Sequence, residues 1–147
     1  MFSLRRATQQ DETAIRVLIH QVGINPMGLE WSHFLLAVDE NDQMIGCGQI
    51  KPHFDGTREL ASIAVIPERR GEGVARAVIE RLQADNPPPL YLTCRSVLGP
   101  MYEKFGFRAL EQGELSPYFK RIWRLAGLIH RLNAEIGPLL VMLWEGK

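Results

Sequence analysis

The hydrophobic and polar positions change period most clearly in the middle of the chain. A short β-branched and apolar run, 60–66, is closed by Pro67, which is typical of a buried strand because proline cannot donate to a sheet ladder. From Val74 onward apolar residues recur every three or four positions, as they do on one face of a helix. The pattern therefore predicts a strand, a glycine-bearing loop over 70–73 and a helix.

The same reading of the rest of the chain predicts further strands and helices. Strands are expected over 2–7, 33–38, 44–51, 90–95, 107–111 and 139–144, and helices over 8–22, from 74 to the proline run 87–89, and over 98–104. The first four strands are linked as a meander, apart from the helix after the first strand. The strand, helix and strand that follow imply a right-handed parallel crossover. Together the elements predict an α/β fold with a mixed sheet.

Composition limits the classes of partner and the number of domains. The 147 residues suit one domain, 1–147, with a core of its own. The 17 basic and 17 acidic side chains cancel, so no general field favours DNA, RNA or an anionic membrane. The N-terminus lacks an apolar signal core, and the late apolar run 139–144 is too short to cross a bilayer. We therefore expect a cytoplasmic protein with no nucleic-acid or membrane partner.

The cysteines and histidines give no sign of a metal site. Cys47 and Cys94 lack metal-ligand spacing, and the four histidines form no cluster in the sequence. We expect two buried free thiols and no metal.

The loop Arg70-Gly71-Glu72-Gly73 has a chemical use at the start of a helix. The first backbone N–H groups of a helix have no intrahelical partners, and the helix dipole is positive there. Glycines let a ligand approach the main chain closely, so the loop can hold a phosphate. It matches neither the P-loop nor the dinucleotide fingerprint. A glycine-rich turn without a ligand is the alternative reading of the two glycines alone.

Two blocks of sequence resemble a known family. The first, Arg70-Gly71-Glu72-Gly73-Val74-Ala75, resembles the coenzyme A signature of the GNAT N-acetyltransferase superfamily, Gln/Arg-x-x-Gly-x-Gly/Ala. Arg70, Gly73 and Ala75 occupy its fixed positions. The second, Tyr102-Glu103-Lys104-Phe105-Gly106-Phe107, resembles the family's Tyr-Glu-Lys-Leu-Gly-Phe element. The resemblance covers nearly the whole chain except the segment 113–136.

The resemblance implies a fold and a co-substrate. The GNAT fold has about seven strands with helices on both faces, and its central strands splay where acetyl-CoA binds. The loop amides would bind the pyrophosphate, and the Val65 N–H would face the thioester carbonyl. The residues implied in binding acetyl-CoA are Ala64, Val65, Arg70, Gly71, Glu72, Gly73, Val74, Ala75, Ser96 and Tyr102. Ser96 and Gly99 stand where the family often has asparagine and alanine, so the chain departs from the family at the positions whose side chains usually help to hold the pantetheine arm.

The resemblance also implies which groups carry the chemistry. Acetyl transfer needs a neutral amine, a stabilised oxyanion and a proton for the departing thiolate. Glu59, at the start of the central strand, matches the carboxylate that deprotonates the amine; the alternative is a solvent-facing charge at a strand end. Tyr102 matches the proton donor to the thiolate; simple packing of its ring is the alternative. His53 is a second candidate for the base, although a lone strand-end histidine is more often structural.

The apolar loop 24–31 corresponds to the family's variable lid over the acceptor. Its residues Met27 and Trp31, together with Glu59, are therefore candidates for contact with the acceptor. Packing of the two apolar side chains against the core is the alternative.

The segment 113–136 departs from the family pattern and predicts an extra helix before the last strand. Ser116 and Pro117 are typical of an N-cap and a first helical residue. The apolar stripe of this helix is Tyr118, Ile122, Leu125, Ile129 and Leu132, and Phe119, Trp123 and Leu128 lie off it. An apolar surface this wide has three readings: burial on its own sheet, a homodimer contact, or a wall of the acceptor pocket.

The sequence therefore predicts an acetyl-CoA-dependent N-acetyltransferase. The expected reaction is direct transfer to a primary amine of a small molecule or of a protein or peptide. A non-catalytic module that binds acyl-CoA as a sensor or interaction subunit is the alternative, because a fold does not determine a function. Glu59 and Tyr102 distinguish the two, since mere binding needs neither. The acceptor and the oligomeric state stay open.

Overall fold

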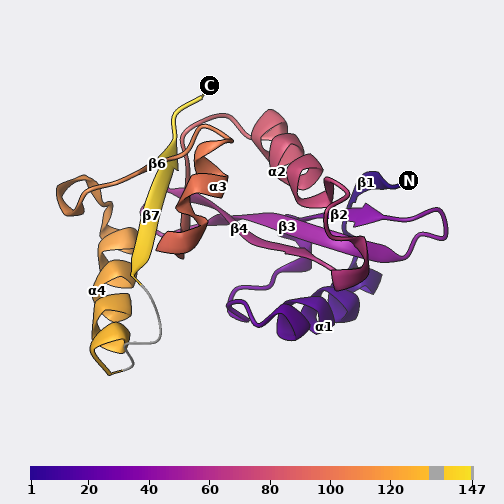
Figure 1. The fold of residues 1–147 in the computed structure, drawn as a ribbon, viewed down its shortest axis with the longest axis horizontal. Helices are drawn as coiled ribbons and strands as arrows, with labels where there is room; N and C mark the ends of the chain where they lie inside the picture. The colour runs from indigo at the N-terminus through magenta and orange to yellow at the C-terminus, as the bar shows by residue number, and fades with distance from the viewer. Residues whose placement is uncertain (133–137, 147) are drawn as a thin grey trace. The chain divides into compact units, whose positions relative to one another are not determined.

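Secondary structure in the computed structural model, which describes residues 1–132 and 138–146, follows the hydrophobic periodicity of the sequence (Figure 1). The strands are β1 (Ser3–Arg6), β2 (Phe34–Val38), β3 (Met44–Pro52), β4 (Arg58–Val65), β5 (Leu90–Arg95), β6 (Arg108–Ala109) and β7 (Leu139–Trp144). The helices are α1 (Glu12–Val22), α2 (Val74–Asp85), α3 (Gly99–Glu103) and α4 (Pro117–Leu132). Short 3-10 helices are η1 (Gln9–Asp11), η2 (Trp31–His33), η3 (Pro67–Arg69), η4 (Ser96–Leu98) and η5 (Gln112–Glu114). The strand order is β1-β2-β3-β4-β5-β7-β6, which confirms the predicted mixed sheet.

The largest difference from the sequence prediction is the length of one strand. The sixth strand, expected over 107–111, is reduced to the two residues of β6. The reason lies just after it, where the Glu111 N–H donates to Glu114 Oε2 at 2.9 Å and turns the chain into η5. The expected inserted helix begins at Pro117 as predicted, and its expected residues 133–136 lie outside the described part of the chain.

The chain divides into two compact units, which we call the N-unit and the C-unit. The N-unit is Met1–Lys51 with Leu60–Asn86, and the C-unit is Pro52–Glu59 with Pro87–Lys147. The first two residues of β4 thus belong to the C-unit and the rest of β4 to the N-unit. The expectation of a single domain stays a prediction.

The N-unit covers both faces of its strands with helices. Strand β1 pairs with β2, and β2 with β3, in antiparallel register. Ile15 and Ile19 of α1 pack with Cys47 of β3 in one apolar cluster. Because successive side chains of a strand point to opposite faces, Gly46 and Gly48 must face the other way. That face is the one that α2 covers, as Figure 1 shows for the two helices.

The two glycines of β3 allow α2 to lie directly on the strand. A Cβ on Gly46 would lie 2.7 Å from Val74 Cγ1 and 3.1 Å from the Ala64 carbonyl oxygen. A Cβ on Gly48 would lie 2.7 Å from Val78 Cγ1. The buried side chains of α2 fill the space that the missing Cβ atoms leave, which fixes the position of the helix start.

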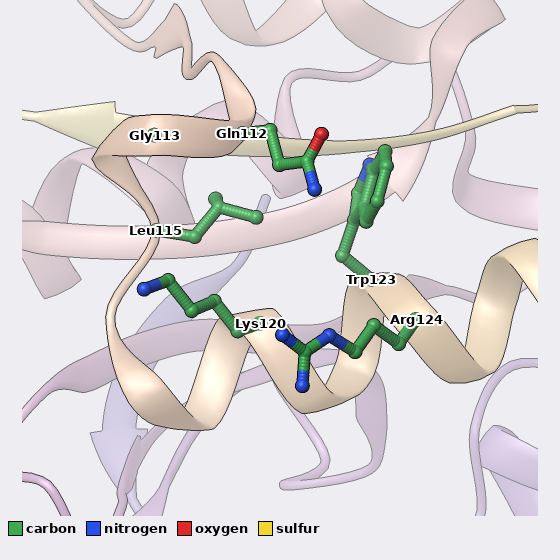
Figure 2. Close-up of a pocket in the computed structure, with 6 residues that line it drawn as sticks. All are labelled: Gln112, Gly113, Leu115, Lys120, Trp123 and Arg124. Atoms are coloured by element: carbon green, nitrogen blue, oxygen red, sulfur yellow. The ribbon is translucent and has the colours of Figure 1, made fainter.

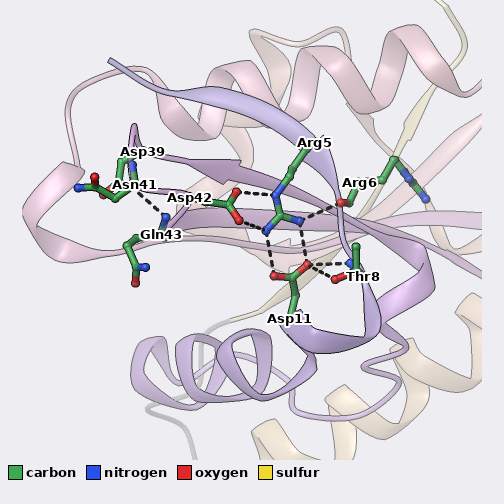
Figure 3. A network of polar contacts seen from close by, with 8 residues as sticks. All are labelled: Arg5, Arg6, Thr8, Asp11, Asp39, Asn41, Asp42 and Gln43. Atoms are coloured by element: carbon green, nitrogen blue, oxygen red, sulfur yellow. Dashed lines mark hydrogen bonds and ion pairs between the residues drawn. The ribbon is translucent and has the colours of Figure 1, made fainter.

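A polar network joins β1, the start of α1 and the β2–β3 turn (Figure 3). The Arg5 guanidinium donates to both carboxylate oxygens of Asp11, at 2.8 and 3.0 Å, and to Asp42 Oδ1 at 2.8 Å. The Thr8 N–H also donates to Asp11 Oδ2, at 2.7 Å. These bonds, the one from Arg5 above all, lower the pKa of Asp11 to about 2. Asp11 thereby completes the helix-start pair with Thr8 that the sequence predicts.

The C-unit places its two helices on opposite faces of β5 and β7 (Figure 1). Strand β7 pairs antiparallel with both β5 and β6. On β7, Val141 packs with Phe119 of α4, whereas its neighbour Leu140 lies against Gly99 of α3. The start of β4 pairs in parallel with β5, with Glu59 opposite Tyr91, which confirms the predicted parallel connection.

Both cysteines are buried free thiols, as the sequence predicts. Burial raises the pKa of Cys47 to about 12, so this thiol stays protonated. Among the described residues no group of three or more His, Cys, Asp and Glu side chains could hold a metal ion. None of the described helices has the length and apolar character needed to span a membrane.

We predict that Gly46→Ala lowers the free energy of unfolding by about 1–3 kcal/mol, because the added methyl group overlaps a side chain and a backbone oxygen. Gly127→Ala in α4 is the matched control, since a Cβ there meets nothing within 4 Å. It should leave stability unchanged or raise it by up to about 1 kcal/mol through helix propensity. Urea unfolding of both variants measures the difference, and equal stabilities would contradict the close packing of α2 on β3.

Candidate functional site

The loop between β4 and α2 turns twice through left-handed backbone. Gly71 and Gly73 both have φ of 82°, a conformation that side chains with a Cβ rarely adopt. A Cβ on either residue would meet no atom within 4 Å, so the space beside the loop is open. The residues 70–73 are exposed, whereas the next residue, Val74, is buried against the sheet. The packing of Val74 therefore fixes an otherwise exposed loop.

The start of α2 offers backbone donors beside this loop. The first intrahelical bond runs from the Ala77 N–H to the Gly73 carbonyl, at 3.0 Å, so the amides before Ala77 have no acceptor within the helix. Arg70 Nε donates to the Val65 carbonyl at 3.3 Å, and Arg69 pairs with Glu72 at 2.9 Å. The free backbone amides of the helix start, the positive helix end and Arg70 suit an anion such as phosphate.

Strand β4 is distorted three residues before its end. Ser62 has a φ of 59°, which costs a residue with a Cβ roughly 1–3 kcal/mol. Its hydroxyl accepts a hydrogen bond from Nε2 of the fully buried Gln49, at 2.8 Å. Gln49 Oε1 has no hydrogen-bond partner among the described residues. The predicted cofactor residues Ala64 and Val65 directly follow this distortion.

The two apolar residues of the 24–31 loop have different surroundings. Met27 is 73% exposed, and its carbonyl accepts a hydrogen bond from Lys51 Nζ at 2.9 Å. Trp31 is half-buried and packs on the apolar cluster of the N-unit. Of the pair proposed to contact the acceptor, Met27 is the more open to solvent.

Glu59 is a buried carboxylate in the C-unit, only 7% exposed. Its Oε1 lies 2.7 Å from His53 Nε2, and its Oε2 accepts a longer hydrogen bond from Thr93 Oγ1, at 3.4 Å. His53 and Glu59 therefore form a close pair, which we call the His53–Glu59 pair. The two residues that the sequence suggests as alternative bases thus lie in direct contact.

Aromatic side chains of α4 enclose the imidazole of this pair. Tyr118 stacks face to face on His53, with ring centroids 3.5 Å apart and planes 11° apart. Phe119 approaches the same ring edge-on at 5.8 Å. Burial, followed by the negative charges of Glu59 and Asp55, raises the pKa of Tyr118. The inserted segment is therefore part of the surroundings of the pair.

Asp55 connects the turn after β3 to the start of α4. Its Oδ2 accepts the Tyr118 N–H at 2.9 Å, and its Oδ1 accepts both the N–H and the hydroxyl of Thr57, at 3.0 and 2.6 Å. Burial opposes ionisation, but these hydrogen bonds outweigh it and hold the pKa of Asp55 well below its ordinary value. The sequence prediction missed Asp55 and this role of Tyr118. The Asp-Gly pair at 55–56 is a turn signal, but it does not indicate which helix the carboxylate caps.

Tyr102 lies on α3, in a different part of the C-unit. Its side chain is half-buried, and its ring meets Phe107 edge-on at 6.2 Å. Burial, and then the neighbouring Cys94, raises the pKa of Tyr102 to about 12. The phenol is therefore protonated at neutral pH. Ser96, at the start of η4, donates its N–H to the Pro138 carbonyl at 2.9 Å.

Strand β5 separates the two reactive candidates. Thr93 bonds to Glu59 and pairs across the sheet with Val141, which faces α4. The next residue, Cys94, points to the opposite face and contacts Met142 at 3.9 Å between sulfurs. Leu140, the residue opposite Cys94 on β7, lies against Gly99 of α3, so Glu59 and the helix that carries Tyr102 lie on opposite faces of β5. The two candidate residues are thus separated by one strand.

A pocket of about 350 Å³ between η5 and α4 contains none of the predicted site residues. It is lined by Gln112, Gly113, Leu115, Lys120, Trp123 and Arg124. Figure 2 shows the Gln112 amide and the Trp123 indole projecting into the same space. Trp123, like Leu128 farther along α4, is exposed, so neither of these two side chains is buried against the sheet.

Comparison with known proteins identifies relatives of the fold. Residues 30–109, more than half of the chain, match the family model of the acetyltransferase (GNAT) domain. No curated protein matches the chain. N-acetylglutamate synthase from Neisseria gonorrhoeae, complexed with coenzyme A and N-acetyl-glutamate, aligns with a TM-score of 0.77 at 18% identity, over 98% of this chain and 35% of that protein. This chain therefore spans about a third of the length of the Neisseria synthase.

Two further structures match along nearly their whole length. Rv2747 from Mycobacterium tuberculosis, in complex with CoA and NLQ, has a TM-score of 0.72 and 19% identity, over 97% of this chain and 98% of that one. ElaA from Escherichia coli has a TM-score of 0.69 and 18% identity, over 99% and 100% of the two chains. At these identities the likeness concerns the fold, and it confirms the fold class that the sequence resemblance implies.

We predict that Asp55→Asn lowers stability at pH 7 by about 0.5–2 kcal/mol, the usual cost of weakening a helix cap. The native pKa of Asp55 is depressed, so its contribution is complete above the ordinary value of 3.8 and is lost as pH falls through the native pKa. The stability difference between parent and variant should therefore shrink at acidic pH. Thermal unfolding at a series of pH values measures it. A difference that is the same at pH 7 and pH 3 would mean that the charge of Asp55 does not stabilise the fold.

Proposed function

Because the chain belongs to the acetyltransferase (GNAT) family, we propose that it transfers an acetyl group from acetyl-CoA directly to a primary amine. The observation that carries this proposal is the position of Glu59 and Tyr102 on opposite faces of β5. Direct transfer needs a base on the side of the amine and an acid on the side of the departing sulfur. A protein that only holds acyl-CoA needs neither group.

The loop before α2 is proposed to bind the pyrophosphate of acetyl-CoA. Its exposed amides, its glycines and the positive end of α2 support this role. The residues assigned to the cofactor are Ala64, Val65, Arg70, Gly71, Glu72, Gly73, Val74, Ala75, Ser96 and Tyr102. The CoA bound in the Neisseria and Mycobacterium proteins supports the choice of cofactor.

Glu59 is proposed to deprotonate the amine. Primary amines are mainly ammonium ions at neutral pH and cannot attack a carbonyl carbon in that form. A carboxylate that is nearly buried holds a proton acceptor in a region of low dielectric, where its attraction for an ammonium group is strong. The neutral amine then attacks the thioester carbon.

Tyr102 is proposed to protonate the thiolate as the carbon–sulfur bond breaks. Its raised pKa keeps the proton on the phenol until that moment. A phenol with this pKa is a weaker acid than a thiol, whose ordinary pKa is about 8.5. Tyr102 therefore cannot remain a phenolate after it has protonated the sulfur. The nitrogen of the tetrahedral adduct must lose a proton in the same step, and this proton restores the phenol.

The experiment that tests the proposal combines binding with turnover. Calorimetry with acetyl-CoA and release of free CoA would be measured with L-glutamate, a polyamine, a lysine peptide and a peptide with a free N-terminus. L-glutamate is included because the synthase of similar fold was solved with N-acetyl-glutamate. CoA release that depends on one of these amines supports the enzyme. Binding of acetyl-CoA without release for any amine would favour the non-catalytic acyl-CoA-binding module.

We predict that Gly73→Val weakens acetyl-CoA binding at least about tenfold, because its side chain would occupy the space beside the loop amides. Gly23→Val is the matched control: Gly23 also has positive φ and open surroundings, but it ends α1. Both variants should lose similar stability through backbone strain, roughly 1–2 kcal/mol. If calorimetry showed that Gly73→Val and Gly23→Val bind acetyl-CoA with the same affinity, the pyrophosphate would have to bind elsewhere.

We predict that Tyr102→Phe lowers the turnover rate at least about tenfold, since proton donation by a positioned side chain typically contributes a hundred- to ten-thousand-fold. Acetyl-CoA affinity should change little, because the hydroxyl acts on the departing thiolate. Tyr91→Phe serves as the control, as it removes a hydroxyl from the other face of β5 and keeps the ring that stacks on Phe119. A Tyr102→Phe rate within twofold of the parent rate would exclude Tyr102 as the acid.

A further inference from the structure

The start of the inserted helix is attached to the turn that carries His53. Asp55 of this turn accepts the Tyr118 N–H at 2.9 Å, and Phe54 meets the Tyr118 ring at 6.1 Å between centroids. Arg121, one turn along α4, lies over the Phe54 ring at 4.7 Å from its centroid. A backbone bond, a ring contact and a cation–π contact therefore hold the first turn of α4 in one position relative to His53.

The two oxygens of Glu59 are held to different degrees. Oε1 lies 2.7 Å from His53 Nε2, which is the length of a charge-assisted hydrogen bond. With Glu59 ionised, Nε2 carries the proton and donates it to Oε1. Oε2 has only the 3.4 Å bond from Thr93, which is long for two oxygens. Oε2 is therefore the oxygen that is better able to accept a further proton.

We infer that His53 is a positioning residue that orients the Glu59 carboxylate, and that Tyr118 of the inserted helix holds His53 in place for this task. The inference rests on the proposed function and gives the insertion a part in the reaction. In the step concerned, an N–H bond of the ammonium breaks, its electron pair stays on nitrogen, and the proton bonds to Glu59 Oε2. The Nε2–H of His53 remains on the imidazole throughout.

Stacking explains why a tyrosine at the start of α4 can act on Glu59 without touching the amine. A face-to-face ring 3.5 Å away leaves the imidazole little freedom to rotate out of the plane in which Nε2 meets Oε1. Phe119, which stands edge-on to His53 and stacks on Tyr91 at 4.9 Å, restricts it further. Loss of the Tyr118 ring should release the imidazole and, with it, the carboxylate.

A pH profile can detect the release of the Glu59 carboxylate if the neighbouring groups keep their charges. The turn presents Asp55, whose pKa is depressed, and α4 presents Tyr118, whose pKa is raised. Neither group therefore changes charge between about pH 5 and pH 9. A change in the acidic limb that the leucine variants produce in this range is therefore not caused by Asp55 or Tyr118 changing charge.

The test compares Tyr118→Leu and His53→Leu with the conservative variants Tyr118→Phe and His53→Gln. Without a donor on Oε1 the buried carboxylate holds its proton more tightly. Both leucine variants should lower kcat at least about tenfold and move the acidic limb of kcat/KM to higher pH. Tyr118→Phe keeps the ring and should stay within twofold of the parent, and His53→Gln, which keeps an N–H donor, should recover part of kcat. Acetyl-CoA affinity should be unchanged in all four.

Two results would overturn the inference. The first is an acidic limb that stays in place in both leucine variants, even if kcat falls, because a merely structural defect does not move it. The second comes from proton NMR of the parent protein, which does not require turnover. A His53 Nε2–H engaged with a carboxylate should give a downfield imidazole resonance that Tyr118→Leu weakens and Tyr118→Phe keeps. If that resonance is absent from the parent, the inference fails; if it is present but no amine is acetylated, only the proposed function fails.

Discussion

A buried carboxylate must find hydrogen-bond donors, because an unpaired charge away from water destabilises a fold by several kcal/mol. Glu59 meets this requirement with His53 on one oxygen and Thr93 on the other. Each donor depends in turn on a further element: Thr93 on the pairing of β5 with β4, and His53 on the turn after β3 and the start of α4. The turn after β3, strand β5 and the start of α4 therefore all contribute to holding the Glu59 carboxylate.

The N-unit meets a different requirement, because the main chain of β3 and helix α2 must approach each other closely. Glycines at 46 and 48 let α2 lie on β3, and the buried Val74 then determines where the loop before the helix stands. Glycine is needed on β3 and in the loop before α2 for opposite reasons. On the strand it is needed because the space is filled, and in the loop because the backbone turns through positive φ beside open space.

The sequence predicts most of the regular structure and little of the contact chemistry. Periodicity and the prolines and glycines at element ends give the strands and helices nearly residue by residue, since these signals are local. The two-residue β6 was not foreseen, because the Glu111–Glu114 bond competes with strand pairing there. Trp31 can be read as a lid residue or a core residue from its loop alone, and the packing of the N-unit shows that part of its side chain lies on the core.

The candidate site also depends on contacts that the sequence does not predict. The sequence indicates Glu59 and His53 as separate candidates. Their separation of six positions does not predict that their side chains lie 2.7 Å apart across a turn. The role of Tyr118 could not be predicted for another reason. Tyr118 is one of five apolar residues at helical spacing, and this spacing is the same whether or not the ring stacks on an imidazole. Contacts between segments distant in the chain depend on tertiary geometry, which no periodicity encodes.

The alternation of side chains along β5 has a consequence for the order of events in the proposed reaction. Thr93 and Cys94 direct the base and the acid to opposite sides of one strand, so the two substrates would arrive by separate approaches. Neither would block the entrance of the other, and no acetyl group would need to rest on the protein between two half-reactions. In the proposed reaction both substrates would therefore be held at the same time.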